Sequence, residues 1–191
     1  MKGMAKMNKI ILASQSPRRK ELLTLLGVNF EAIPADIEEQ IDFNNDLVKE
    51  IEKLSYQKAF HIFKDHNDSL VIGSDTIVKI GNKILGKPKS YEQAKEMLQA
   101  LSGNTHEVVT GVTILKDDIV ETFSSVAKVT FYQLTSNEID EYIKTNEPMD
   151  KAGAYAIQGI GAKFIKSIEG DYYTIMGLPI GELYHRLQKY M

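Results

Sequence analysis

The sequence contains no cysteine, so disulfide bonds, thiolate metal sites and cysteine nucleophiles are all excluded. It has only four histidines, and none of them lies in a recognisable catalytic or metal-binding motif. Because a G-x-S-x-G motif is absent as well, a Ser/His/Asp hydrolase is poorly supported. The lack of cysteine is compatible with the cytoplasm, and we expect a cytoplasmic protein.

Long apolar runs and a large excess of charge are also missing. The run Ile10-Ile11-Leu12-Ala13 is too short for a signal peptide or a membrane span, and it predicts a first strand. The net charge of −3 argues against a protein held to nucleic acid or to a membrane by bulk charge. A small anionic ligand is compatible with this balance, since local cations can bind it whatever the total charge.

The 191 residues, of which 43% are hydrophobic, correspond to one domain or to two small lobes that share a core. Periodicity and turn signals predict strands at 10–13, 69–80, 83–85, 106–115 and 119–131, a weakly alternating segment at 30–37, a hairpin at 163–176, and helices at 17–26, 46–64, 90–101, 135–143 and 177–187. We expect the hairpin to turn at Glu169-Gly170-Asp171 and His106 to be an ordinary surface histidine. Strands and helices do not alternate strictly, which predicts a mixed-sheet α/β or α+β domain, bilobed around a cleft.

One carboxylate lies in the middle of an expected strand. Asp75 is flanked on both sides by the apolar residues of the segment 69–80. A desolvated carboxylate costs several kcal/mol unless it is paired, metal-bound or protonated. Asp75 is therefore either a functional residue or a structural one, held in a turn or a buried salt bridge.

Cations occupy unusual positions in two expected helices. Arg18 and Arg19 follow the N-cap Ser16 and Pro17, where two positive charges are unfavourable for the helix dipole unless an anion binds there. The alternative is a pair of solvated arginines. Lys58 falls inside the apolar face of the helix 46–64, so it must snorkel, find a counter-charge, or reach a functional cleft.

The segment from Gly81 to Lys87 reads G-x-x-x-x-G-K, which resembles most of a Walker A loop. We reject this interpretation, because Pro88 stands where that loop needs a Ser or Thr hydroxyl and a helix start. The glycines instead predict a hairpin turn at Gly81-Asn82 and a strand exit at Gly86. Lys87, held before a proline, remains a candidate fixed cation.

The stretch from Asp150 to Ala162 combines an acid, the base Lys151, the amide Gln158 and several glycines. Glycines at this density permit left-handed backbone angles and a close approach of main-chain N–H groups to a ligand. The alternative is an ordinary loop between two elements.

Together these polar residues suit a polyphosphate with an oxygen-loving metal such as Mg²⁺. The cations are Arg18, Arg19, Lys58, Lys87 and Lys151, the acids are Glu38, Asp75 and Asp150, and the neutral groups are Ser14, Thr76 and Gln158. Glu38 is the candidate metal ligand beside Asp75, although the pair Glu38-Glu39 also fits an exposed strand end.

The chain resembles the Maf family of nucleoside triphosphate pyrophosphatases over nearly its full length. The matching segments are Leu12 to Leu23, Ile37-Glu38-Glu39, Gly73 to Val78, Gly86-Lys87-Pro88, Leu101-Ser102-Gly103 with His106, Glu147-Pro148 through Gly161, Gly170-Asp171-Tyr172 and Gly177-Leu178-Pro179. Gln15, at a position that is often small, and the leading Met1 to Lys6 depart from the family pattern.

The resemblance implies one bilobed α/β domain over residues 1–191, related to the house-cleaning inosine triphosphatases, with the active site in the cleft. It implies hydrolysis of a nucleoside triphosphate to the monophosphate and pyrophosphate with a divalent metal, Mg²⁺ or Mn²⁺. Asp75 would be the proton acceptor, while Arg18, Thr76 and Gln158 would set base preference. Gln158 after Tyr155-Ala156-Ile157 resembles the subgroup that cleaves dTTP and UTP.

The remaining expectations concern phosphate, metal and partners. We assign phosphate binding to Ser14, Arg19, Lys58, Lys87 and Lys151, and metal binding to Glu38 and Asp75. The partner is a small nucleotide, with neither nucleic acid nor membrane, and the oligomeric state is left open to a homodimer. The family's older label, septum-formation inhibitor, leaves a non-enzymatic role in cell division as the rival function.

Overall fold

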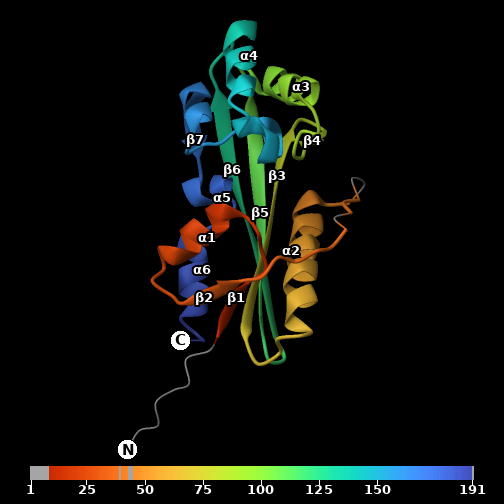
Figure 1. Ribbon diagram of the computed structural model, residues 1–191, viewed down its shortest axis with the longest axis vertical. Helices are drawn as coiled ribbons and strands as arrows, with labels where there is room; N and C mark the ends of the chain where they lie inside the picture. Colours follow the sequence, from red (N-terminus) through yellow and green to blue (C-terminus); the bar gives the residue numbers. More distant parts are fainter. Residues whose placement is uncertain (1–8, 39, 43–44, 191) are drawn as a thin grey trace, which may run out of the picture. The chain divides into compact units, whose positions relative to one another are not determined.

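The computed structural model describes residues 9–38, 40–42 and 45–190 (Figure 1). The leading Met1 to Lys6 and Glu39 of the Ile37-Glu38-Glu39 motif lie outside these residues. The strands are β1 Ile10–Leu12, β2 Phe30–Ala32, β3 Leu70–Ile80, β4 Lys83–Leu85, β5 Thr105–Lys116, β6 Ile119–Phe131 and β7 Ile165–Glu169. The helices are α1 Pro17–Thr24, α2 Leu47–Phe63, α3 Tyr91–Leu101, α4 Ser136–Lys144, α5 Tyr172–Met176 and α6 Ile180–Leu187, with short 3₁₀ turns η1 Glu147–Asp150, η2 Ala152–Ala154 and η3 Ile160–Phe164.

The strands form one seven-stranded sheet in the order β2-β1-β3-β5-β6-β7, with β4 paired to β3. Strand β1 is parallel to both β2 and β3, whereas β4 on β3 and β7 on β6 are antiparallel. The sheet is therefore mixed, and the predicted mixed-sheet α/β class is confirmed. The hairpin of β3 and β4, which turns at Gly81 with φ of 55°, also confirms that the Walker-like glycines form a turn.

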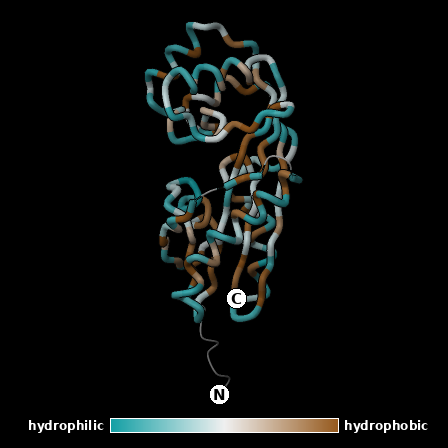
Figure 2. Tube along the Cα trace, turned by 90° about the vertical axis from the view of Figure 1, so that its right-hand side faces the viewer, coloured by the Kyte–Doolittle hydropathy of each residue, from teal (hydrophilic) through white to brown (hydrophobic). Residues whose placement is uncertain are grey.

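The chain divides into two compact units, and the division falls between Asp75 and Thr76 in β3. The first unit comprises residues 1–75, 111–124 and 177–191, and the second comprises residues 76–110 and 125–176. Hydrophobic segments, in brown, recur along the coloured part of the trace (Figure 2), and each unit buries apolar residues of its own, such as Ile11 in the first and Leu98 in the second. None of the helices within the described ranges is long and apolar enough to cross a membrane.

In the first unit, helix α2 packs closely on strands β3 and β5. A Cβ atom at Gly73 would lie 2.3 Å from the backbone oxygen of Ser55, and one at Gly111 would lie 2.8 Å from atoms of Ile51. Both glycines are needed because any side chain would push the helix away from the strands. Helix α2 begins at Asp46, whose side chain accepts a hydrogen bond from the N–H of Val48.

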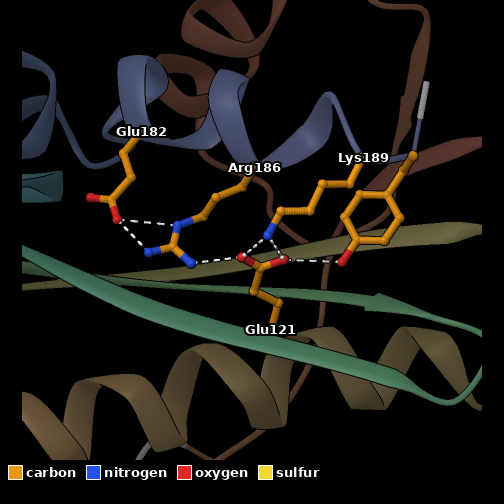
Figure 3. A network of polar contacts seen from close by, with 5 residues as sticks. Glu121, Glu182, Arg186 and Lys189 are labelled. Carbon is orange, nitrogen blue, oxygen red and sulfur yellow. Dashed lines mark hydrogen bonds and ion pairs between the residues drawn. The ribbon is translucent and has the colours of Figure 1, made fainter.

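The last helix, α6, is attached to β6 by one carboxylate (Figure 3). Glu121 accepts hydrogen bonds from Arg186 at 2.7 Å, from Lys189 at 3.1 Å and from the hydroxyl of Tyr190 at 3.0 Å. Burial raises the pKa of Glu121, but these hydrogen bonds outweigh burial and lower it overall. The network fixes the end of the chain within the first unit.

In the second unit, helix α4 has a side-chain cap and the aromatic core includes a histidine. Thr135 and Glu138 form a reciprocal capping box at the start of α4. His106 is 1% exposed and its Nε2 lies 2.8 Å from the hydroxyl of Tyr155. The expectation of a surface histidine is therefore wrong, because the ring packs edge-on against Phe131 and Tyr155.

The predicted hairpin at 163–176 is also wrong in its second half. Strand β7 is followed by the short helix α5, and Asp171 accepts hydrogen bonds from the N–H groups of Tyr173 and Thr174. Gly170, with φ of 111°, therefore leads into a helix N-cap and not into a returning strand. A smaller difference is that α1 ends at Thr24, two residues before the predicted end of that helix.

Candidate functional site

In the first unit, the mid-strand carboxylate is paired with the lysine of the apolar helix face. The ammonium of Lys58, from α2, donates a hydrogen bond to Oδ1 of Asp75. The side chains of Lys58 and Asp75 are 10% and 9% exposed, respectively. Asp75 therefore supplies the counter-charge that Lys58 requires on the apolar face of α2. The same salt bridge is the structural role that we considered for Asp75 as the alternative to catalysis.

The backbone around Asp75 explains why this pair can form. Gly73, two residues earlier in β3, lets the backbone of α2 approach closely enough for Lys58 to reach the strand. The adjacent Ser74 is fully buried and donates a hydrogen bond of 3.0 Å to the carbonyl of Gly177. Asp75 is therefore held by contacts on both sides of β3.

The arginine-bearing start of α1 is tied to the same carbonyl. Arg19 donates from Nε to the carbonyl of Gly177 at 2.9 Å and from Nη1 to Oγ of Ser14 at 3.4 Å. Ser14 is 6% exposed and also accepts a hydrogen bond from the N–H of Ser16. The structure thus brings together Ser14 and Arg19, two of the residues that the sequence assigned to phosphate, while Arg18 lies half-buried beside them in the first turn of α1.

The proposed metal ligands differ in their surroundings. Glu38 is exposed in an irregular segment after β2, whereas Asp75 is buried in β3. Within the part of the chain that the structure describes, no three His, Asp or Glu residues gather into a metal site. Carboxylate oxygens such as theirs are the protein ligands that Mg²⁺ uses, together with substrate phosphates and water.

In the second unit, Thr76 begins a chain of hydroxyl hydrogen bonds. Its Oγ1 lies 2.9 Å from Oγ1 of Thr110 on β5, and Thr110 donates to the carbonyl of Thr174 at 2.8 Å. Thr110 and Thr174 are both fully buried, while Thr76 is partly exposed. Thr76 is thus fixed through side chains that the sequence did not single out.

The two lysines of the second unit lie on neighbouring segments. The N–H of Gly153 donates to the carbonyl of Gly86 at 3.1 Å, which joins the segment of Lys151 to that of Lys87. Lys87 is exposed. Lys151 forms an ion pair with Asp150 and donates to the carbonyl of Glu147 at 3.3 Å.

The loop that carries Gln158 is organised by Tyr142 and Glu147. The hydroxyl of Tyr142 donates to Oε1 of Glu147 at 2.7 Å and accepts from the N–H of Ala156 at 3.1 Å. Glu147 also accepts from the N–H groups of Ile160 and Gly161, each at 3.0 Å. The loop is therefore anchored on both sides of Gln158, which is itself exposed.

This arrangement engages part of the glycine-rich backbone that the sequence offered either to a ligand or to an ordinary loop. The N–H of Gly161 is already bound by Glu147, and a Cβ at Gly159 would lie 2.3 Å from Oε2 of Glu147. Burial raises the pKa of Glu147, but its hydrogen bonds from Ile160, Tyr142 and Gly161 outweigh burial and lower it. Burial, followed by the bond to Glu147, raises the pKa of Tyr142.

The sequence missed Glu147, Tyr142, Thr110 and Thr174 as residues that shape the site. Tyr142 suits the apolar face of its helix, and hydrophobic periodicity carries no information about its hydroxyl. Glu147 stands directly before a proline at a turn. Its contact with the glycine-rich loop could not be predicted, because the two are far apart in the sequence. Buried threonines in strands such as β5 are ordinary β-formers, so Thr110 carried no signal at all.

Known proteins match this chain over nearly its full length. A family model described as Maf-like protein matches residues 9–190. A dTTP/UTP pyrophosphatase of Bacillus cytotoxicus is 50% identical over 184 residues, which cover 96% of this chain and 96% of the relative. A protein of the same name from Bacillus anthracis has the same identity and coverage.

Among solved structures, that of the Staphylococcus aureus Ham1 protein aligns with a TM-score of 0.52. The alignment covers 96% of this chain and 100% of the other, at 14% sequence identity. At that identity, the likeness establishes a shared fold and nothing more.

Proposed function

The chain belongs to the Maf-like protein family, and we propose that it is a pyrophosphatase that hydrolyses dTTP and UTP to the monophosphate and pyrophosphate. The observation that carries this proposal is the 50% identity, over 96% of both chains, with a relative named for that activity. The same names do not favour a non-enzymatic role in cell division. Such an enzyme removes nucleotides from the cytoplasmic pool, and the cytoplasm is its proposed location.

The reaction requires water to attack the α-phosphorus while the bond from that phosphorus to the bridging oxygen breaks. The proton of the attacking water goes to a base, and pyrophosphate leaves with the bridging oxygen. Asp75 is the proposed base, because it is a carboxylate fixed in a strand and held by Lys58. Lys58 orients this carboxylate, and it is also a proposed phosphate ligand.

The other cations are assigned to the triphosphate. Arg19 is oriented by Gly177 and Ser14, so its guanidinium is pre-organised for an anion. Lys87 and Lys151 lie on joined segments and supply positive charge for the leaving pyrophosphate. Glu38 and Asp75 are the proposed ligands of Mg²⁺ or Mn²⁺. When bound, such an ion neutralises phosphate charge and acidifies a water molecule.

Base preference is assigned to Arg18, Thr76 and Gln158. The amide of Gln158 offers one acceptor and a donor group, which complements the 4-oxo and N3–H edge of thymine and uracil. A glutamate there is acceptor-only, so we expect Gln158→Glu to lower kcat/KM for dTTP and UTP by about 5- to 150-fold. An equal loss for GTP and 7-methyl-GTP would contradict a role in base recognition.

The proposal is tested by incubating the purified chain with a panel of nucleoside triphosphates and Mg²⁺ or Mn²⁺. We expect dTTP and UTP to give dTMP and UMP with pyrophosphate as the inorganic product, resolved by chromatography. Orthophosphate would point to a phosphatase instead. If the chain hydrolyses none of the nucleotides, the non-enzymatic role in cell division becomes the better explanation.

A further inference from the structure

The ion pair between Lys58 and Asp75 has no net charge as a pair. The ammonium of Lys58 donates to Oδ1 of Asp75, and both side chains are buried. A protein site attracts a divalent cation through an excess of negative charge among its ligands. Glu38, the other proposed ligand, is exposed, and within the described part of the chain no three His, Asp or Glu residues gather to supply more charge.

The ammonium and a metal ion compete for the same carboxylate. The negative charge of Asp75 is already balanced by Lys58, so a second cation brought to this carboxylate is repelled by the first. Solvent and salt screen this repulsion only weakly, because the pair is buried. A divalent ion therefore binds Asp75 strongly only when the charge of Lys58 is neutralised or has moved away.

Of the two side chains, Lys58 is the one that can change its partner. Asp75 is short and lies within β3, where the preceding Ser74 is fully buried and bonded to the carbonyl of Gly177 at 3.0 Å. The backbone of α2 is also fixed, since it would lie only 2.3 Å from a Cβ atom at Gly73. The ammonium of Lys58 is carried on a flexible stem of four carbons, so it can move while helix and strand stay in place.

A nucleoside triphosphate supplies the negative charge that the pair lacks. Its phosphate oxygens can accept from the ammonium of Lys58 and can also bind a divalent ion. We propose that Lys58 is an internal counter-ion, which excludes the metal from Asp75 in the nucleotide-free protein and transfers to phosphate when the nucleotide binds. The inference rests on the proposed function and on the assignment of Asp75 to the metal. It adds that nucleotide and metal each raise the affinity of the protein for the other.

The test measures Mn²⁺ binding to the nucleotide-free protein by electron paramagnetic resonance, which needs no turnover. Lys58→Gln removes the charge but keeps an N–H donor for Asp75, and we expect it to bind Mn²⁺ at least about tenfold more tightly than the wild type. Lys58→Arg keeps the charge and should keep the weak binding of the wild type. Lys116→Gln is the matched control, because Lys116 belongs to the same unit, has a side chain that is 12% exposed and pairs with Asp117 instead.

An unchanged Mn²⁺ affinity in folded Lys58→Gln would overturn the inference. A gain that persists when Asp75→Asn is added would overturn it as well, because the metal would then bind elsewhere.

If Lys58→Gln does not fold, the melting temperature of the wild type gives the answer. We expect Mn²⁺ alone to leave Tm unchanged, and Mn²⁺ with the non-hydrolysable analogue α,β-methylene-UTP to raise Tm above the value with the analogue in EDTA. A rise with Mn²⁺ alone as large as the rise with both ligands would contradict the inference. Failure of the wild type to cleave dTTP and UTP would instead refute the proposed function, which these metal titrations do not measure.

Discussion

Lys58 on α2 and Asp75 on β3 form an ion pair whose side chains are 10% and 9% exposed. A buried pair of this kind is costly to break from one side, because the remaining buried charge loses its counter-ion. The same pair contains the proposed catalytic base. This one contact therefore contributes both to stability and to the proposed catalysis. A single substitution at either residue is expected to change both.

The separation requires a double substitution. We expect Asp75→Asn to lower kcat by about 10²–10⁴-fold and also to lower the free energy of unfolding by about 3–5 kcal/mol, since the buried ion pair with Lys58 is lost. Lys58→Met combined with Asp75→Asn should restore most of the stability and none of the activity. Urea unfolding and steady-state kinetics measure the two quantities. Recovery of activity in the double variant would contradict Asp75 as the base.

The close packing of α2 on β3 predicts a strong effect at Gly73. A Cβ there would lie 2.3 Å from the Ser55 backbone oxygen and 2.7 Å from the Ala59 nitrogen, so the helix must move away. We expect Gly73→Ala to cost about 1–3 kcal/mol in unfolding free energy and to reduce kcat through misplacement of Asp75. Gly181→Ala is the control, because nothing lies within 4 Å of a Cβ at that position. Equal stability of the two variants would show that the packing is looser than described.

The anchoring of the Gln158 loop predicts that Tyr142→Phe acts at a distance on base recognition. Loss of the hydroxyl leaves the Ala156 N–H and the Glu147 carboxylate short of a partner, which costs about 1–3 kcal/mol. We expect kcat/KM for dTTP to fall, and the further loss caused by Gln158→Ala to be smaller in this background than in the wild type. Tyr184→Phe, at an exposed tyrosine, should change neither quantity. Fully additive effects of Tyr142→Phe and Gln158→Ala would argue that the loop is not held through Tyr142.

The buried histidine predicts a pH dependence of stability. Burial lowers the pKa of His106 from 6.5 to about 4, and its Nδ1 has no hydrogen-bond partner among the described residues. The unfolded chain therefore binds more protons than the folded one between these values, so stability is present above pH 6.5 and is lost as pH falls toward 4. The shift corresponds to about 3 kcal/mol.

The measurement is the free energy of unfolding from pH 4 to 7 in the wild type and in His106→Phe. We expect the slope between pH 4 and 6.5 to be reduced in the variant. His185→Gln, at an exposed histidine, should leave the slope as it is. The same slope in all three proteins would mean that His106 is accessible to protons in the folded state.

Much of the fold could be predicted from the sequence because the signals were local. The apolar face and Asp46 cap of α2, the Gly81 hairpin and the capping box at Thr135 each depend on residues a few positions apart. The hairpin at 163–176 failed because Gly170-Asp171 is compatible with both a tight turn and a helix N-cap. Only the side chain of Asp171, which binds the N–H of Thr174, distinguishes the two.

Site residues could be predicted where the residue type is unusual for its position in a helix or strand. Asp75 in a strand and Lys58 on an apolar face were both conspicuous, and the structure joins them. Glu147 and Thr110 were not conspicuous, because a glutamate at a turn and a threonine in a strand suit their local structure. Their importance arises from contacts across the fold, which no local pattern encodes.

The central claim is that water attacks the α-phosphorus of dTTP or UTP and displaces pyrophosphate. It is tested most directly by hydrolysis of UTP in ¹⁸O-labelled water, followed by mass spectrometry of both products. The account predicts a single labelled oxygen in UMP and none in pyrophosphate. Label in pyrophosphate, or orthophosphate as the inorganic product, would contradict it.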